Sequence, residues 1–233
     1  MLAVNGLQVF YGQSLILNDV SIEVPTGQAV CVMGRNGVGK TTLLKAIMGT
    51  LKTKQGKITY NGQDITHTQA HRRAAAGMGY VPQGRGIFPH LTVYENLLMG
   101  FEAVEHHKIS QSAIDEVYTI FPVLKQMSKR VAGTLSGGQQ QQLAIGRVLV
   151  RDPKLLLLDE PTEGIQPNIV EEIENVIHSL REQKSIAILL IEQFLDFALG
   201  IADTCYVMEK GHIVVHSSTK NLSPEIIKEH LSV

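Results

Sequence analysis

The sequence has few charged side chains, few cysteines and no long apolar run. Of its 233 residues, 21 are Lys or Arg and 22 are Asp or Glu, so the formal charge is −1. Proteins that act mainly by neutralising phosphate backbones need a concentrated basic surface, and no long basic run occurs here. We therefore expect no nucleic-acid partner. Only 18% of residues are charged, below the roughly 25% of typical soluble domains, which is consistent with subunit contacts.

The absence of long apolar runs and of a cysteine framework bears on the compartment. The two cysteines, Cys31 and Cys205, lie in short apolar runs, which is typical of buried thiols in a reducing compartment. No run reaches the roughly 18 apolar residues of a membrane-spanning helix, and polar residues interrupt the uncharged N-terminal segment. We therefore predict a cytoplasmic protein without signal peptide or membrane span, whose work at any membrane depends on partners.

Short runs with β-strand character recur along the chain. Residues 155–158 and 186–191 are apolar throughout, as in parallel sheets covered on both faces, whereas the N-terminal runs alternate, as in half-exposed antiparallel sheets. The predicted fold class is therefore α/β, with a mainly parallel core sheet and an antiparallel β subdomain. The predicted strands are 7–10, 29–33, 57–60, 155–158, 186–191, 205–208 and 213–216.

A helical region interrupts this strand pattern between about residues 85 and 150. Ile114, Val117, Tyr118 and Phe121 recur at helical spacing before Pro122, which we interpret as a core-facing stripe. A further helix is predicted near the C-terminus, where Ser223 is followed by proline and glutamate, the pattern of a helix start. The predicted organisation is one domain, 1–233, with a core at 1–84 and 151–216, an inserted helical subdomain at 85–150 and a C-terminal helix within 217–233.

A phosphate-binding loop is predicted after the strand at 29–33. The segment from Gly34 to Thr41 matches G-x-x-x-x-G-K-[ST] and precedes a helix-compatible stretch, whereas a glycine-rich turn with a surface lysine would not require this order. Glycines let backbone N–H groups face phosphate oxygens, Lys40 supplies a point charge, and Thr41 offers a hydroxyl to Mg²⁺. The predicted phosphate-binding residues are Gly34, Arg35, Asn36, Gly37, Val38, Gly39, Lys40, Thr41 and Thr42.

Two adjacent carboxylates, Asp159 and Glu160, follow the apolar run 155–158. They fall at the carboxyl edge of the predicted sheet, where open α/β sheets bind ligands. If Asp159 turns toward Mg²⁺ or its waters, Glu160 can reach a water aligned on the γ-phosphorus and act as general base. A strand followed by a solvated turn gives the same pattern, but the phosphate-loop motif favours the functional interpretation.

A second glycine-rich segment opens a helix-prone stretch at 140–150. Its residues are Leu135, Ser136, Gly137, Gly138 and Gln139. A serine and two glycines at a helix N-terminus can bind an anion through exposed N–H groups and the helix dipole. By spacing alone, an ordinary helix start capped by serine is favoured.

The run Leu135–Gln139 is identical to the signature sequence of ATP-binding cassette (ABC) proteins. Together with the phosphate loop and residues 155–160, it resembles that family in order and approximate spacing over nearly the whole chain. In that family two cassettes pair head to tail, and the signature of one closes on the ATP held by the other. The resemblance implies an ATPase that uses Mg²⁺ with ATP. The implied partners are a second cassette, two transmembrane permease subunits and a periplasmic or surface solute-binding protein, which would place this chain on the inner face of the cell membrane.

The resemblance assigns further positions. Tyr11 lies where the family stacks an aromatic ring on adenine. Gln83 resembles the glutamine that joins the core to the helical subdomain and reaches Mg²⁺ and the attacking water. Residues 87–93 resemble the surface that grips a transporter's membrane subunit, so Phe88 and Leu91 are either partner contacts or subdomain core. The implied catalytic residues are Glu160, Gln193 and Gln83, and the implied metal ligands are Thr41, Gln83 and Asp159, the last through water.

Two departures from the family pattern narrow the resemblance. Gln193 stands where the family usually has a histidine, and glutamine cannot become a cation. Residues 163–166 replace a loop that usually contains a small residue and an aspartate, which bears on coupling between two ATP sites. With residues 81–85, both departures resemble the bacterial branch for branched-chain amino acid and urea uptake, and residues 83–88, 140–142 and 192–198 are most similar to its urea-uptake ATPases. The resemblance therefore predicts the ATPase subunit of an importer of urea or short amides. The alternatives are branched-chain amino acid import and a soluble ABC ATPase acting on ribosomes or nucleic acid.

Overall fold

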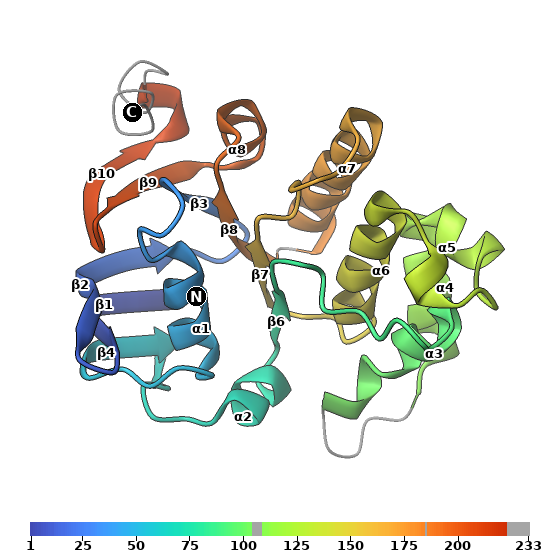
Figure 1. The fold of residues 1–233 in the computed structure, drawn as a ribbon, viewed down its shortest axis with the longest axis horizontal. Coiled ribbons are helices and arrows are strands. Elements are labelled where there is room, and N and C mark those ends of the chain that lie inside the picture. The colour runs from blue at the N-terminus through green and yellow to red at the C-terminus, as the bar shows by residue number, and fades with distance from the viewer. Residues whose placement is uncertain (104–108, 185, 223–233) are drawn as a thin grey trace.

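The computed structural model describes residues 1–103, 109–184 and 186–222 and builds them around two β-sheets (Figure 1). The larger sheet has the strand order β10-β9-β3-β8-β7-β6, in which β10 runs antiparallel to β9 and every other neighbouring pair is parallel. Its strands are β3 (Ala29–Met33), β6 (Met78–Val81), β7 (Leu155–Asp159), β8 (Ala187–Glu192), β9 (Thr204–Glu209) and β10 (His212–Ser218).

The smaller sheet is antiparallel and has the order β2-β1-β4-β5. Its strands are β1 (Leu2–Tyr11), β2 (Ser14–Val24), β4 (Gln55–Tyr60) and β5 (Gln63–Asp64). The predicted combination of a mainly parallel core sheet with an antiparallel one is therefore confirmed.

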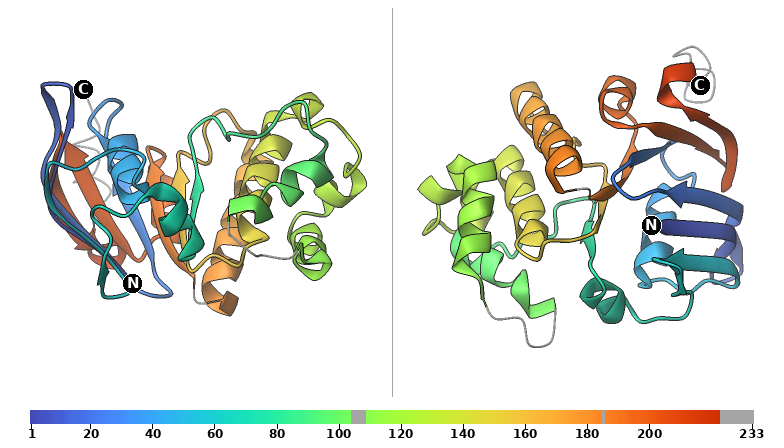
Figure 2. Two further views of the ribbon diagram at one scale, coloured as in Figure 1. Left: turned by 90° about the horizontal axis from the view of Figure 1, so that it is seen from below. Right: turned by 180° about the vertical axis from the view of Figure 1, so that it is seen from behind.

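Helix α1 (Lys40–Met48) packs between the two sheets, where Leu43, Leu44 and Ile47 are fully buried. Helices α3 to α6 form a group on the far side of β6 and β7 from the smaller sheet, as Figures 1 and 2 both show. The remaining helices are α2 (Ala70–Ala75), α3 (Val93–Leu98), α4 (Gln111–Ile120), α5 (Pro122–Gln126), α6 (Gly137–Leu149), α7 (Pro167–Lys184) and α8 (Leu195–Ile201).

The parallel sheet is covered on both faces, as its apolar strands predict. Leu155 and Leu157 of β7 face the core shared with α1 and the smaller sheet, whereas Leu156 and Leu158 face the core shared with the helices of the opposite face. This alternation explains why β7 is an unbroken apolar run, because neither set of side chains meets water. The carboxyl ends of β3, β7 and β8 thereby become a fixed edge between packed layers.

The strand predictions missed β2, β5 and β6, and β5 is only two residues long. Strand β2 carries a polar interruption at Asn18 and Asp19, and Asp19 adopts φ 55°. Strand β6 is short and contains Gly79, a residue that strands disfavour. The predicted C-terminal helix at Ser223 lies outside the described residues.

The helical stripe is confirmed as core, because Ile114, Val117, Tyr118 and Phe121 are all buried. Pro122 ends this pattern and immediately begins α5 as its first residue.

The thiols of Cys31 and Cys205 are both free and fully buried, as predicted. They lie opposite each other on β3 and β9. Burial raises the pKa of the Cys31 thiol most strongly, and the neighbouring Cys205 raises it further. The thiol therefore stays protonated. Within residues 1–103, 109–184 and 186–222, no helix combines the length and apolar character that crossing a membrane requires.

Candidate active site

The predicted phosphate loop connects β3 to α1 in the order that the motif requires. Gly37 and Gly39 adopt φ 80° and 114°, a region that side chains disfavour. A Cβ at position 39 would lie 2.6 Å from Leu17 of the smaller sheet, so the loop also needs glycine for close packing. Lys40 is buried, and its Nζ donates to the carbonyls of Gly34 (2.8 Å) and Arg35 (3.0 Å). The lysine therefore lies folded over its own loop.

Asp159 ends strand β7 and lies against the phosphate loop. Its Oδ1 accepts a hydrogen bond from Thr41 Oγ1 (3.1 Å), and its Oδ2 accepts one from the Tyr80 hydroxyl (3.2 Å). Burial raises the pKa of Asp159, and these two bonds act in the opposite direction. Burial and the nearby Asp159 raise the pKa of Tyr80, which keeps its hydroxyl a donor. Tyr80 was not among the predicted site residues.

Glu160 lies just beyond the end of β7 at φ 48°, an uncommon backbone conformation for a residue other than glycine. Its buried carboxylate is 3.4 Å from Lys40 Nζ. It accepts hydrogen bonds from Gln193 Nε2 (2.8 Å) and Gln83 Nε2 (3.2 Å). The three predicted catalytic residues, Glu160, Gln193 and Gln83, are therefore in direct contact.

These residues arrive from the carboxyl ends of three neighbouring strands. Gln83 follows β6, Glu160 follows β7 and Gln193 follows β8. Gln193 Nε2 also donates to Asn36 Oδ1 (2.8 Å), which ties it to the phosphate loop. The arrangement is the ligand-binding edge of an open parallel sheet.

A cavity of about 280 Å³ opens at this edge. Tyr11 stands at its side with 46% of its surface exposed, so the ring is available for stacking. Ile16 also lines it and was not predicted from the sequence. The lining residues are Tyr11, Ile16, Asn36, Gly37, Gly39, Lys40, Thr41, Thr42, Gln83 and Glu160.

The signature segment is not part of this cavity. Ser136 caps helix α6 and forms a reciprocal capping box with Gln139, with bonds of 3.3 and 3.0 Å. None of Leu135, Ser136, Gly137, Gly138 and Gln139 lines the cavity at the phosphate loop. The structure thus brings the other predicted residues together and leaves the signature on a separate surface of the same chain.

Glu192, at the end of β8, was also missed by the sequence analysis. Its buried carboxylate accepts bonds from Thr162 Oγ1 (2.5 Å) and from the backbone N–H groups of Gln193 (2.8 Å) and Phe194 (3.3 Å). Burial raises its pKa, while the bond from Thr162 opposes this effect. Glu192 therefore fixes the turn from which Gln193 extends toward Glu160.

The donor set fits Mg²⁺. The Thr41 hydroxyl and the Asp159 carboxylate lie 3.1 Å apart. The Gln83 side chain contacts Glu160, the residue that follows Asp159. These are oxygen ligands, which Mg²⁺ prefers, and in phosphate sites it is held by one or two carboxylates together with substrate phosphates. In the described part of the chain, no three His, Cys, Asp or Glu side chains form a metal site by themselves.

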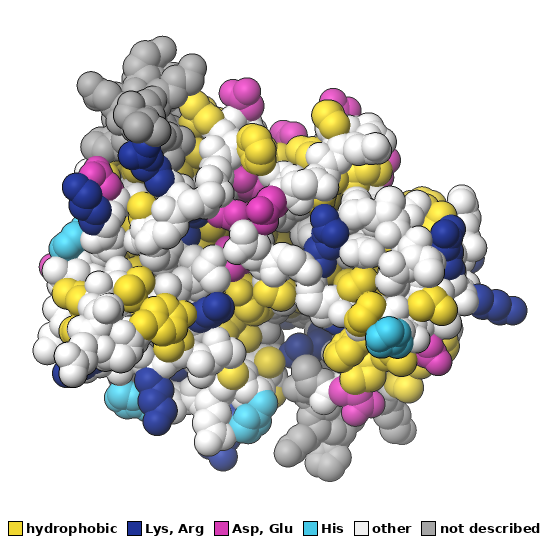
Figure 3. Space-filling view, in the orientation of Figure 1, with side chains coloured by type: hydrophobic (Ala, Val, Ile, Leu, Met, Phe, Trp, Pro, Cys, Tyr) yellow, Lys and Arg dark blue, Asp and Glu magenta, His cyan; other side chains and the backbone are white. Residues whose placement is uncertain are grey.

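The surface around the edge of the sheet is mixed in character. In the space-filling view, acidic side chains gather near the centre of the face, over the area where Figure 1 labels β7 and β8 (Figure 3). Phe88 is 42% exposed and lies 5.1 Å beneath the Arg147 guanidinium, whereas Leu91 is half-buried. The exposure of Phe88 therefore fits a partner contact better than a place in the core of the helical subdomain.

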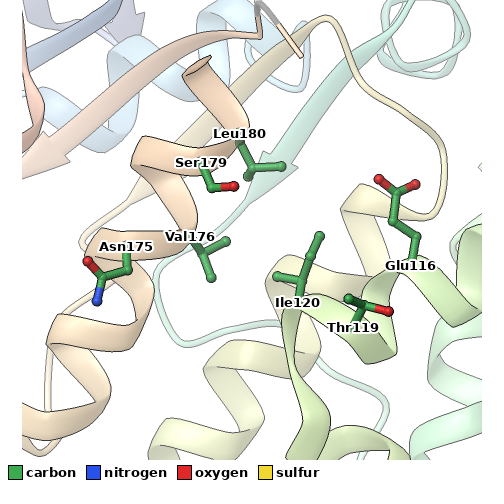
Figure 4. A pocket seen from close by; sticks show the side chains of 7 residues that line it. All are labelled: Glu116, Thr119, Ile120, Asn175, Val176, Ser179 and Leu180. Atoms are coloured by element: carbon green, nitrogen blue, oxygen red, sulfur yellow. The ribbon is translucent and has the colours of Figure 1, made fainter. Parts of the chain in front are cut away.

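A second cavity, of about 310 Å³, lies between α4 and α7 (Figure 4). Apolar side chains from both helices face each other across it, with polar side chains around them. It contains none of the residues that the sequence motifs predict. The lining residues are Glu116, Thr119, Ile120, Asn175, Val176, Ser179 and Leu180.

Comparison with known proteins identifies relatives along nearly the whole chain. The family model described as ABC transporter matches residues 17–163. The chain is 40% identical over 220 residues to the high-affinity branched-chain amino acid transport ATP-binding protein BraG of Pseudomonas aeruginosa, which covers 94% of this chain and 93% of that protein. It is 37% identical over 222 residues to the probable branched-chain amino acid transport ATP-binding protein LivF of Archaeoglobus fulgidus, which covers 95% and 94%.

Solved structures agree with this result. A crystal structure of the ADP conformation of an ATP-binding cassette of an ABC transporter is 30% identical and superposes with a TM-score of 0.83. The match covers 98% of this chain and 97% of that one.

Proposed function

The chain belongs to the ABC transporter family as an ATPase that couples ATP hydrolysis to transport, and from that premise we propose that it drives import of branched-chain amino acids. The observation that carries this proposal is the 40% identity to BraG over 94% of the chain, with LivF at 37%. Because these relatives are amino acid transport proteins by name, they favour the amino acid alternative over the urea interpretation. Urea import is the second candidate, and it rests on the likeness of residues 83–88, 140–142 and 192–198.

We propose that the cavity beside the phosphate loop binds ATP with Mg²⁺. Tyr11 stacks on the base, and the loop N–H groups and Lys40 hold the phosphates. Thr41 and Gln83, with Asp159 through water, would hold Mg²⁺, which would supply charge stabilisation at the phosphates. The short Thr41–Asp159 and Lys40–Glu160 distances support this assignment, because one nucleotide can reach all of these side chains.

Glu160 is the proposed general base. Its carboxylate accepts a proton from the attacking water, and Gln193 orients that carboxylate through a hydrogen bond. In the structure Gln83 donates to the same carboxylate. Lys40 lies against Glu160 in the structure, and phosphates would compete for the same ammonium group. Nucleotide binding would therefore free Glu160 from its ion pair and leave it available as a base.

We further propose that the chain works as one of two paired cassettes. The signature residues Ser136 and Gly137 open a helix away from the phosphate loop, which suits contact with ATP bound to a partner cassette. Two permease subunits and a solute-binding protein complete the proposed importer, with this chain on the inner face of the membrane. The exposed Phe88 beside Arg147 is a candidate permease contact.

The solute is tested by deleting the gene in its host and measuring uptake of labelled leucine and labelled urea. Loss of leucine uptake, restored by the wild-type gene, is the expected result. Loss of urea uptake alone would transfer the assignment to the second candidate. Loss of neither would contradict both importers, and co-purification with ribosomes or nucleic acid rather than with membranes would then favour the soluble class.

A further inference from the structure

Gln83 is held by two carboxylates at once. Its Nε2 donates to Glu160 Oε2 (3.2 Å) and to Glu163 Oε2 (3.0 Å). Ionised carboxylates accept hydrogen bonds and cannot donate them, so the nitrogen of the amide must face both residues. The contact to Glu160 belongs to the candidate active site, whereas the contact to Glu163 has no role in the catalysis proposed above.

Glu163 holds Gln83 from outside the cavity. Gln83 lines the cavity beside the phosphate loop, but Glu163 does not. Glu163 is exposed in the turn that follows β7, where its N–H donates to the carbonyl of Glu160 (3.2 Å). This turn is one of the two places where the sequence departs from the ABC pattern, because a small residue usually stands there.

The backbone after Gln83 turns sharply, and hydrogen bonds hold it, including one from the Arg147 guanidinium to the carbonyl of Gly86 (2.7 Å). Gly84, Arg85 and Gly86 all have positive φ, at 76°, 72° and 60°. A Cβ on Gly84 would meet nothing within 4 Å. Two backbone hydrogen bonds close this segment, from Arg85 N to Pro82 O (3.0 Å) and from Gly86 N to Gly84 O (2.8 Å). Side-chain contacts of Gln83 therefore contribute to fixing the joint.

The orientation of the amide bears on its proposed work. The oxygen of an amide lies on the side opposite the nitrogen, and only the oxygen can bind a cation. While the nitrogen faces Glu160 and Glu163, the oxygen points away from them. The amide must therefore turn, and break its bonds to Glu160 and Glu163, before its oxygen can reach a metal beside Asp159.

We propose that Glu163 is a positioning residue that restrains Gln83 in the observed orientation and opposes its rotation toward Mg²⁺. This proposal rests on the metal-binding role proposed for Gln83. Release of the contact is then part of the cost of assembling the site. This cost depends on the long side chain of Glu163 in the turn after β7, since a small side chain there could not reach Gln83.

The test compares three variants of the full chain. Glu163→Ala removes the acceptor, and Glu163→Gln keeps an acceptor oxygen without the charge. Glu171→Ala removes an exposed carboxylate from α7 and serves as the matched control. The first measurement is amide hydrogen exchange of Arg85 and Gly86 in the nucleotide-free protein. The second is the Mg²⁺ concentration that gives half-maximal ATP turnover.

Glu163→Ala is expected to accelerate exchange at both amides and to lower the half-maximal Mg²⁺ concentration, each by about two- to tenfold, the effect of one hydrogen bond. Glu163→Gln and Glu171→Ala are expected to stay within about twofold of wild type, since loss of one exposed charge has little effect. Unchanged values in Glu163→Ala, a raised Mg²⁺ requirement, or equal shifts in both Glu163 variants would overturn the proposal. If the wild-type protein turns over no ATP, the proposed function is wrong. The hydrogen exchange of Arg85 and Gly86 then decides by itself whether Glu163 restrains Gln83.

Discussion

Gln193 Nε2 lies 2.8 Å from Glu160 Oε1, so an uncharged amide occupies the place beside the proposed base where the family usually has a histidine. The same nitrogen bonds Asn36 of the phosphate loop at 2.8 Å. Gln193 therefore holds the base and the loop together by hydrogen bonding alone. A protonated histidine at this position would add a positive charge beside Glu160, which glutamine cannot do.

Replacing Gln193 by alanine is expected to lower ATP turnover about tenfold or more, because Glu160 loses one of the bonds that orient it. ATP affinity should change little, since Gln193 does not line the cavity. Steady-state phosphate release and a nucleotide-binding titration measure the two effects separately. A variant with normal turnover would show that Glu160 needs no support from Gln193.

Replacing Gln193 by histidine is expected to add a pH dependence to turnover. The wild-type amide does not titrate, whereas a histidine side chain changes charge near about pH 6.5. The pH profile of Gln193→His should therefore show a transition near this value that the wild-type profile lacks. Identical profiles between pH 5.5 and 8 would contradict contact between position 193 and the reacting groups.

Lys40→Ala is expected to weaken ATP binding by about 10- to 100-fold, the effect of losing hydrogen bonds to a charged group. The matched control is Lys45→Ala, because Lys45 lies on the same helix α1 but is exposed and does not line the cavity. A binding titration with ATP and Mg²⁺ makes the comparison. Equal affinities of Lys40→Ala and wild type would remove Lys40 from the phosphate site.

Arg73 supports the far end of the helix that Lys40 begins. Its buried guanidinium donates to the carbonyls of Ala46 (3.0 Å) and Ile47 (2.6 Å) at the end of α1, and also to those of Thr66 (3.0 Å) and Thr68 (2.8 Å). Lysine cannot reproduce this planar set of donors, so Arg73→Lys should lower the free energy of unfolding by about 2–4 kcal/mol.

Denaturant unfolding measures this effect, with Arg72→Lys as the control. Arg72 is the exposed neighbour of Arg73 on α2 and should tolerate lysine with little loss of stability. Equal stabilities of the two variants would mean that the carbonyls at the end of α1 do not depend on Arg73.

Glu192 is expected to make stability fall as pH rises. Burial raises its folded-state pKa above the ordinary value of 4.5, so between these two values the folded protein binds more protons than the unfolded one. The stabilisation from protonated Glu192 is complete below the ordinary value and is lost as pH rises through the folded-state pKa. Denaturant unfolding at several pH values, compared with Glu192→Gln, isolates this contribution. A stability difference between the two proteins that does not vary with pH would contradict it.

The parts of the site that follow from local sequence were predictable. The phosphate loop is one continuous segment between a strand and a helix, and Asp159 and Glu160 directly follow an apolar strand. In contrast, the contacts of Glu160 with Gln83 and Gln193 join the ends of β6, β7 and β8. No periodicity of the sequence reports such long-range pairing, and only the resemblance to ABC proteins indicated these residues.

The missed residues are ones whose role depends on partners far away in the chain. Tyr80 lies in β6, a strand that was not predicted because it is short and contains Gly79. The Tyr80 hydroxyl reaches Asp159 because β6 pairs with β7. Glu163 was recognised as a departure from the family pattern, but its contact with Gln83 required the folded structure. No residue of the nucleotide site was predicted to contact the solute, so its geometry does not distinguish solutes. The urea prediction used short segments, whereas similarity over 94% of the chain favours branched-chain amino acid transport proteins.

ATP turnover by purified wild type and Glu160→Gln measures whether this chain hydrolyses ATP with Glu160 as the base. Glutamine keeps the shape of the side chain but cannot accept the proton. Glu160→Gln is expected to bind ATP nearly as well as wild type and to turn it over about 10²- to 10⁴-fold more slowly, the contribution of a general base. Turnover by Glu160→Gln equal to that of wild type would contradict the role of Glu160 as the base.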